Sequence, residues 1–271
     1  MLFKDHLVLI RGGGDLATGV VYRLHQAGFP VIVTELARPL VVRRKVAVAT
    51  AVLENHVQIE NLQAQLAHSP EEALELACTA TIPVLVSPQI PQLPNYPITQ
   101  LPILIDARIA KRNIDTRIDQ AALVIGLGPG FTAGVDCHAV IETMRGHTLG
   151  RVIWDGPALP DTGTPGIVAG KGAERVLRAP AAGIVNWRLE IGDYVNEGDL
   201  IGDVAGEAVV APFSGVLRGL IAPGNKVPAG YKIGDLDARG SREACFTISD
   251  KALSIGGGLL EAILTYLNKN S

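Results

Sequence analysis

The chain has 271 residues, enough for two domains or one large domain with a substantial core. Its 24 Lys and Arg against 27 Asp and Glu give a net charge of −3, which offers no electrostatic basis for nucleic acid binding. No apolar run approaches the length of a membrane span, and the N-terminus lacks a signal-peptide core. Three cysteines without a C-x-x-C pair fit free thiols. We therefore expect a cytoplasmic protein with no membrane contact and no metal site.

The first informative pattern is a strand, a glycine-rich turn and a helix in direct succession. Residues 7–10 form an apolar run that predicts a buried strand. Residues 15–27 have helical periodicity, and Gly28 follows where a helix ends in a left-handed residue. This arrangement is typical of the first unit of a nucleotide-binding sheet.

The turn itself reads Gly12-x-Gly14-x-x-Ala17, which fits the G-x-G-x-x-G/A form. Backbone N–H groups and a helix N-terminus hold a phosphate in such turns. After a second predicted strand at 31–34 comes an acid, where dinucleotide-binding units place the group that binds a ribose hydroxyl. We expect a small phosphorylated ligand here, although tight strand-to-helix packing would also explain the glycines. The predicted binding residues are Arg11, Gly12, Gly13, Gly14, Asp15, Thr18 and Glu35.

Strand and helix signals continue to alternate through the first half. Apolar runs predict strands at 83–86, 102–106 and 122–126, and helices are predicted at 39–54 and at 69–77. The second of these helices opens with a Ser69/Glu72 capping box. The alternation indicates an α/β, Rossmann-like, mostly parallel sheet with helices on both faces. Prolines at every third position, from Pro88 to Pro97, predict a stiff surface connection or a segment that a partner recognises.

A second glycine loop follows the predicted strand at 122–126, so it should lie at the same ligand-binding edge. We assign ligand binding to Gly126, Gly128 and Gly130. A helix is expected behind this loop, with His138 and Glu142 four residues apart on one face. Such a pair could support acid–base chemistry or bind a metal, or could simply line the core.

A third candidate lies just after the predicted strand at 102–106. Asp106 is followed by Arg108, Lys111 and Arg112, which could bind a phosphate or a carboxylate or could form a structural ion-pair cluster. Asp106 and His138 are the predicted catalytic residues for proton transfer. Arg108 is assigned to the ligand.

The second half has a different organisation. Residues 1–155 are assigned to the nucleotide- or cofactor-binding domain, and 156–172, rich in Gly and Pro, to a linker. Residues 173–240 contain a repeat at an offset of 32 residues: RAPAAGIV at 178–185 is echoed by VAPFSGVL at 210–217. This pattern resembles the barrel-sandwich hybrid of biotinyl and lipoyl carriers. The joining hairpin at 204–208 has no lysine, which excludes a carrier role.

Residues 241–271 form a C-terminal segment, in which residues 256–268 predict a helix with an apolar stripe. This stripe should pack on one of the domains or on a second copy of the chain, which makes a homo-oligomer an open expectation.

Several strings together resemble one known family over nearly the whole chain. They are IRGGGDLATGVVYRLHQAGFPVIVTE, RPLVVRRKVA, IDARIAKRN, VIGLGPGFTAGVDCHAVIETMRGHTLGRVI, ERVLRAP and FTISDKALSIGGGLLEAIL. They are similar to the YqeB-type family of selenium-dependent molybdenum hydroxylase accessory proteins. The resemblance implies a cytosolic factor that helps mature a molybdenum hydroxylase by handling selenium or the molybdopterin cofactor. Its partner would be the apo-molybdenum hydroxylase or a selenium-donor protein.

Three functions therefore stay open. The first is a maturation factor that binds a nucleotide or a molybdopterin-type dinucleotide across the two glycine loops. The second is an NAD(P)-dependent oxidoreductase, which Glu35 favours, although no Tyr-x-x-x-Lys pair follows. The third is a non-catalytic scaffold that docks a partner.

Overall fold

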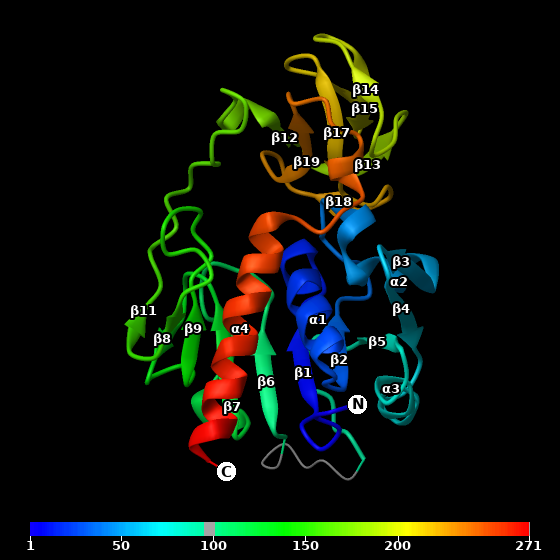
Figure 1. Ribbon diagram of the computed structural model, residues 1–271. Coiled ribbons are helices and arrows are strands. Elements are labelled where there is room, and N and C mark those ends of the chain that lie inside the picture. Colours follow the sequence, from blue (N-terminus) through cyan, green and yellow to red (C-terminus); the bar gives the residue numbers. More distant parts are fainter. Residues whose placement is uncertain (95–100, 271) are drawn as a thin grey trace. The chain divides into compact units, whose positions relative to one another are not determined.

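The computed structural model describes residues 1–94 and 101–270 (Figure 1). Part of the proline-rich connection, including Pro97, lies outside the described residues. The chain forms two compact units, each built from separate stretches of sequence. Unit 1 comprises Met1–Ala37, Ala47–Thr162 and Ile248–Ser271, and unit 2 comprises Arg38–Val46 and Gly163–Thr247.

Unit 1 is built on a nine-stranded, mostly parallel sheet with the order β10-β9-β7-β6-β1-β2-β5-β4-β3. Only the two outer strands, β3 and β10, run antiparallel to their neighbours. Every strand predicted in the first half is confirmed. The strands are β1 Val8–Arg11, β2 Val31–Glu35, β3 His56–Ile59, β4 Leu62–Ala67, β5 Thr81–Val86, β6 Ile103–Asp106, β7 Leu123–Leu127, β9 Ala139–Ile141 and β10 Val152–Ile153, with β8 Thr132–Ala133 and β11 Gly156–Pro157 as a separate pair.

Two predicted helices are confirmed with their caps. α1 spans Asp15–Ala27, and Gly28 ends it with a φ of 89°, a backbone conformation that glycine adopts without strain. α3 spans Pro70–Ala77, where the side chain of Ser69 accepts a hydrogen bond from the backbone N–H of Glu72.

Two other predicted helices are absent. Residues 39–54 instead form the 3₁₀ turns Arg44–Val46 and Val48–Thr50 and the four-residue α2, Ala51–Glu54. The chain leaves unit 1 at residue 37 and returns at residue 47, so the apolar spacing of this segment serves two different cores. Behind the second glycine loop the chain forms β8 and β9, because the β-branched pair Val140-Ile141 joins the sheet beside β7.

The C-terminal helix α4, Asp250–Lys269, begins six residues before its predicted start. Ser249 caps it by accepting a hydrogen bond from the N–H of Ala252. α4 lies side by side with α1 (Figure 1), and glycines permit their close approach. A Cβ at Gly19 would collide with the backbone of Ala252, and one at Gly256 would collide with the carbonyl of Gly19.

Unit 2 consists of two four-stranded antiparallel sheets, ordered β12-β19-β17-β14 and β16-β15-β13-β18, around one apolar core. Strands β12 to β15 recur about 32 residues later as β16 to β19. Exchanging each strand for its counterpart in the other copy turns the order of one sheet into the order of the other. The strands are β12 Val176–Arg178, β13 Gly183–Trp187, β14 Tyr194–Val195, β15 Leu200–Val204, β16 Glu207–Val210, β17 Gly215–Leu220, β18 Lys226–Val227 and β19 Lys232–Asp237. The β15–β16 hairpin turns at Ala205 and Gly206, both with positive φ.

Candidate functional site

The sheet of unit 1 has a topological switch point at β1, where later strands are added on both sides of it. β1 pairs in parallel with β2 on one side and with β6 on the other. Open α/β sheets bind ligands outside the carboxyl ends of the strands at such a point. Here the glycine turn that follows β1 meets the loop that follows β6, because a Cβ at Gly12 would lie 3.0 Å from Cα of Arg108. The structure thus brings together the first and third candidates of the sequence.

Two glycines of the turn donate their backbone N–H groups to other parts of unit 1. Gly12 donates to the carbonyl of Thr34 at 2.8 Å, and Gly13 donates to Oε2 of Glu35 at 2.9 Å. Gly13 also packs against Ala49, whose N lies 2.9 Å from where a Cβ would be. Gly14 is half-buried and is the N-cap of α1, and as a glycine it offers no side-chain acceptor to the helix. The N-terminus of α1, with its positive dipole end, therefore begins at the sheet edge directly after the glycine turn.

Glu35 binds the backbone through both carboxylate oxygens. Oε2 accepts from Gly13, and Oε1 accepts from the N–H of Leu36 at 2.7 Å. Burial raises the pKa of Glu35, although the two backbone hydrogen bonds oppose the rise. Each oxygen keeps one lone pair, so the carboxylate can still accept hydrogen bonds from a ligand.

Thr18 has a structural role. Its side chain is fully buried, donates to the carbonyl of Gly14 at 3.0 Å and accepts from the N–H of Val48 at 3.0 Å. The hydroxyl thus links the segment at residue 48 to α1, and both of these hydrogen bonds are made within the protein, so the expected contact of Thr18 with a phosphate stays a prediction.

Arg11 and Arg108 are joined by an acid that the sequence analysis did not single out. Asp115 accepts from Nη1 and Nη2 of Arg11 at 2.8 and 2.9 Å and from Nη2 of Arg108 at 2.7 Å. The hydrogen bond from Arg11, and then that from Arg108, lower the pKa of Asp115 to about 2, although burial opposes the shift. The side chain of Arg11 is 2% exposed and that of Asp115 47% exposed. Asp115 is therefore more exposed than both of the arginine side chains that it binds.

Asp106 is fully occupied by protein donors. Its carboxylate accepts from the backbone N–H and the guanidinium of Arg108 and from Oγ1 of Thr116 at 2.6 Å. Burial opposes ionisation of Arg108, but hydrogen bonds and the charges of Asp106 and Asp115 raise its pKa overall. Asp106 thus positions Arg108. This arrangement fits both expectations for the segment: a structural ion-pair cluster, and a site where Arg108 binds a phosphate or a carboxylate.

The glycines of the second loop are explained by close packing. A Cβ at Gly126 would lie 2.5 Å from the ring of Phe131, and one at Gly128 would collide with Thr143. At Gly130 it would collide with the backbone of Arg112. Gly126 also pairs with Asp106 across β7 and β6, so the loop does begin at the same sheet edge as the first.

His138 lies away from Asp106. Its Nδ1 accepts from the N–H of Val124 at 2.9 Å, and Val124 precedes Gly126, the partner of Asp106, by two residues along β7. His138 therefore sits about 7 Å back along the strand from the level of Asp106. The expected helical pair with Glu142 is wrong, because this segment is extended. Glu142 instead accepts backbone hydrogen bonds from Met144 and Leu159.

Lys251, in the first turn of α4, is a second residue that the sequence analysis missed. It is half-buried, and burial lowers its pKa, with Asp15 as the first opposing charge. Glu142 also acts on it. Within the described residues its ammonium group makes no hydrogen bond or ion pair. Lys251 thus adds a cation near the first turn of α1. Lys251 reaches this position only because α4 packs on α1, and no local sequence motif predicts it.

The buried thiols are poorly suited to reactivity. Burial raises the pKa of Cys137 to about 12, and it also raises the pKa of Cys245, which is 1% exposed.

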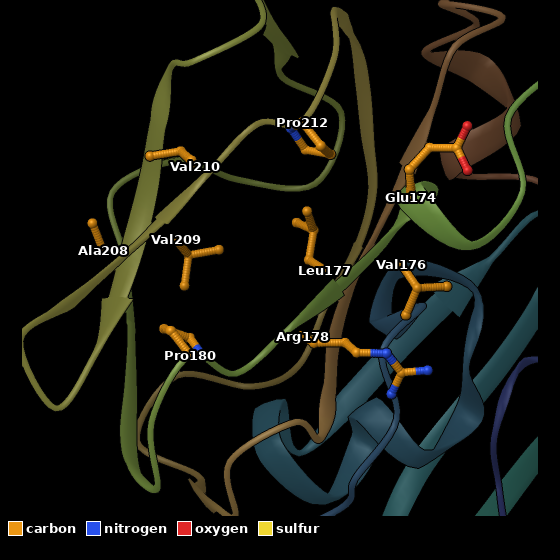
Figure 2. Close-up of a pocket in the computed structure, with 9 residues that line it drawn as sticks. All are labelled: Glu174, Val176, Leu177, Arg178, Pro180, Ala208, Val209, Val210 and Pro212. Atoms are coloured by element: carbon orange, nitrogen blue, oxygen red, sulfur yellow. The ribbon is translucent and has the colours of Figure 1, made fainter.

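Unit 2 contains a separate cavity of about 210 Å³ (Figure 2). Its lining is largely aliphatic, with Glu174 and Arg178 as the charged members. It contains no residue of the glycine turn. The lining residues are Glu174, Val176, Leu177, Arg178, Pro180, Ala208, Val209, Val210 and Pro212.

Fold and site together define an α/β protein with a glycine turn, an acid and several cations at the carboxyl edge of a mostly parallel sheet. No family model matches the chain. The chain is 47% identical over 264 residues to the uncharacterized protein YqeB of Escherichia coli (strain K12), a match that covers 97% of this chain. It belongs to the YqeB-type family, and it spans about half the length of that relative, 48%. None of the described helices is both long and apolar enough to cross a membrane.

Proposed function

We propose that this chain is a cytoplasmic accessory factor for a molybdenum hydroxylase and binds a phosphorylated ligand at the switch point of unit 1. The ligand class is a nucleotide or a molybdopterin-type dinucleotide. The observation that carries the proposal is the N-terminus of α1, which begins at the glycine turn without a side chain at its N-cap, with Glu35 bonded to Gly13 and Lys251 near Asp15. Helix N–H groups and a nearby ammonium group are suited to a phosphate.

The residues divide into two roles under this proposal. Gly14 and the first turn of α1 would bind the phosphate, Lys251 would neutralise its charge, and Glu35 would bind a hydroxyl group. Asp106 and Asp115 hold Arg108 and Arg11 at the border of the site. An anionic group of the ligand could compete with the exposed Asp115 for these two cations.

For the architecture we propose a Rossmann-like unit 1 with helices on both faces of its sheet. Unit 2 would be a barrel-sandwich hybrid without a carrier lysine. The recurrence of its strands after 32 residues supports this assignment. Such a unit would dock the apo-hydroxylase or a selenium-donor protein.

The alternative function is an NAD(P)-dependent oxidoreductase. The specific observation in its favour is Glu35, which ends β2 beside the glycine turn and keeps a free lone pair on each oxygen. A purely non-catalytic scaffold is the third candidate.

Native mass spectrometry of protein purified from a host that makes molybdopterin tests these functions. Gly14 has an extended backbone, φ −67° and ψ −179°, which valine also adopts, so Gly14→Val should fold while its methyl groups block the helix N-terminus. Gly257→Ala is the matched control, because its Cβ meets nothing within 4 Å. We expect a pterin or pterin dinucleotide mass on the wild type and on Gly257→Ala but not on Gly14→Val.

The other outcomes contradict the proposal. A bound NAD(P) mass would establish the oxidoreductase alternative. Protein that stays bare after both ligands are added would leave only the scaffold.

A further inference from the structure

The cavity of unit 2 lies between edge strands of its two sheets (Figure 2). β12 stands at one end of the first sheet and β16 at one end of the second, so among the described residues each pairs on one side only. We propose that this cavity binds a short extended segment of a partner protein. The segment is apolar in its middle, with a cation at one end and a carboxylate at the other. The proposal rests on the docking role proposed for unit 2 and does not need the ligand of unit 1.

Equivalent parts of the two halves of unit 2 form this cavity. Apart from Glu174, its lining residues form four pairs, and the members of each pair are 32 residues apart, which is the offset of the sequence repeat. Both copies therefore contribute the same edge, and the cavity arises from the repeat itself. The four pairs are Val176 and Ala208, Leu177 and Val209, Arg178 and Val210, and Pro180 and Pro212.

The backbone of β16 has groups that point to its open edge. Ala211 donates to the carbonyl of Asp199 at 2.9 Å and accepts from the N–H of Gly198 at 2.8 Å, so its backbone groups face the side of β15. Successive residues of a strand turn these groups to opposite sides. Those of Val210, and of Ala208 two residues earlier, therefore face the open edge. Outside the sheet neither residue has a described backbone partner.

The backbone of β12 repeats this arrangement. Ala179 donates to the carbonyl of Tyr231 at 2.9 Å and accepts from the N–H of Gly230 at 2.8 Å. The backbone N–H and C=O of Arg178 therefore face away from β19, as those of Val210 face away from β15. An extended peptide satisfies such groups by adding a strand, a mode of recognition in which main-chain hydrogen bonds supply affinity.

The floor of the cavity is apolar. Leu177 and Val209 lie opposite one another on the two strands (Figure 2), are 4% and 5% exposed, and belong to the hydrophobic core of unit 2. Val210 is 49% exposed and lines the cavity from β16. Apolar side chains of a bound segment would cover these residues, and removing apolar surface from water is favourable. The middle of the segment should therefore be aliphatic.

The two charged lining residues indicate what lies at the ends of the segment. Glu174 belongs to the 3₁₀ turn Ala173–Arg175 before β12, and Arg178 is the last residue of β12, so their charges lie at opposite ends of this strand (Figure 2). Nη1 of Arg178 donates to the carbonyl of Gly230 at 2.9 Å, which leaves other guanidinium donors for a carboxylate. Glu174 accepts from the N–H of Gly172 at 2.9 Å and remains an anion that can bind a cation. The described lining residues of β16 carry no charge, so these two residues fix the direction of the segment.

Fluorescence anisotropy with labelled peptides tests the charge requirement on the full chain. The probes are two capped peptides of one composition, Lys-Val-Val-Val-Asp and Asp-Val-Val-Val-Lys, and a third peptide in which serines replace the valines. We expect one valine peptide to bind about threefold or more tighter than the other, because exposed ion pairs contribute up to about fivefold each. The serine peptide should not bind. The double variant Glu174→Lys/Arg178→Glu changes two exposed side chains, so it should fold and should prefer the opposite valine peptide.

A second variant tests the backbone requirement. Val210→Pro removes the N–H that faces the open edge and places a ring there, a position at which edge strands tolerate proline. Val210→Thr is the matched control, because it keeps the N–H and a branched side chain. We expect Val210→Pro to weaken binding of the preferred peptide by about fivefold or more, the effect of losing a hydrogen bond and of a steric clash. Val210→Thr and Gly14→Val should bind within about twofold of the wild type, since neither removes a hydrogen bond of the site.

The outcomes separate this site from the glycine turn. Peptide binding that survives in Gly14→Val and is lost in Val210→Pro assigns the segment to the cavity of unit 2, even if unit 1 binds no ligand. Equal binding of the two valine peptides, binding of the serine peptide, or no binding at millimolar concentration would overturn the proposal. Self-association of the chain that Val210→Pro abolishes, without peptide binding, would identify a second copy as the occupant and would overturn it as well.

Discussion

Adjacent glycines in α4 offer a direct test of how closely this helix packs on α1. A Cβ at Gly256 would fall less than 3.0 Å from the carbonyl oxygen of Gly19, whereas nothing lies within 4 Å of a Cβ at Gly257. Both residues lie inside the same 20-residue helix, so Gly256→Ala and Gly257→Ala differ only in what the new methyl group meets.

The magnitudes follow from two opposing effects. Each substitution gains about 1 kcal/mol of helix propensity. Gly256→Ala also forces two backbones apart, and overpacking costs about 1–3 kcal/mol, here at the upper end because a carbonyl cannot rotate away as a side chain can. We expect Gly257→Ala to raise the free energy of unfolding by about 1 kcal/mol and Gly256→Ala to lower it by about 1–2 kcal/mol.

Urea unfolding followed by the fluorescence of Trp154 is the appropriate assay. Trp154 belongs to unit 1, and Nζ of Lys269 in α4 lies 5.4 Å from its ring centroid. A Trp187→Phe background removes the other tryptophan, which lies in unit 2. If Gly256→Ala proves as stable as Gly257→Ala, α4 does not pack on α1 as described, and the placement of Lys251 near α1 loses its basis.

Three further predictions concern charges and thiols. Because the pKa of Asp115 is lowered to about 2, its contribution to stability is complete above about pH 4 and is lost as the pH falls toward 2. Thermal denaturation across this range should show a larger loss for the wild type than for Asp115→Asn, and parallel curves would contradict the contact. Lys251→Met should weaken NAD⁺ or pterin binding tenfold or more by titration, with Lys251→Arg intermediate; unchanged affinity would remove Lys251 from the site. A thiol reagent should label one cysteine in the native protein, exposed Cys78, and all three after unfolding, whereas fast labelling of Cys137 or Cys245 would contradict their burial.

Local patterns predicted those elements whose stabilising contacts are local. α1 and Gly28 were predicted to the residue, because an amphipathic period and a left-handed glycine act within one helix. The segment 39–54 was predicted wrongly for the opposite reason. Its first part is held by unit 2, where Nε of Arg44 donates to the carbonyl of Leu220 at 2.7 Å. A one-dimensional period cannot reveal that a chain crosses from one core to another within ten residues.

The candidate site shows the same division. The meeting of Gly12, Glu35 and Arg108 could be predicted, because the carboxyl ends of parallel strands share one edge. The short sequence separation of Asp115 from Arg108 makes their ion pair predictable. Nothing local indicates that Asp115 also binds Arg11, which lies 104 residues away in the sequence. Lys251 arrives only through the glycine contacts of α4, and these involve pairs such as Gly19 and Gly256 that are far apart in sequence.

The position of Glu35 narrows the class of ligand further. Each of its oxygens accepts one backbone N–H, so the two remaining lone pairs can accept hydrogen bonds from the two hydroxyls of an unmodified ribose. A phosphate on the 2′-hydroxyl would instead place its negative charge against this carboxylate. The carboxylate could not rotate away without losing its hydrogen bonds from the N–H groups of Gly13 and Leu36. Under the proposed function we therefore expect NAD to bind more tightly than NADP among nicotinamide cofactors, and among pterin dinucleotides we expect tighter binding of those whose nucleoside keeps both ribose hydroxyls free. A preference for NADP would mean that Glu35 serves only to hold the glycine turn.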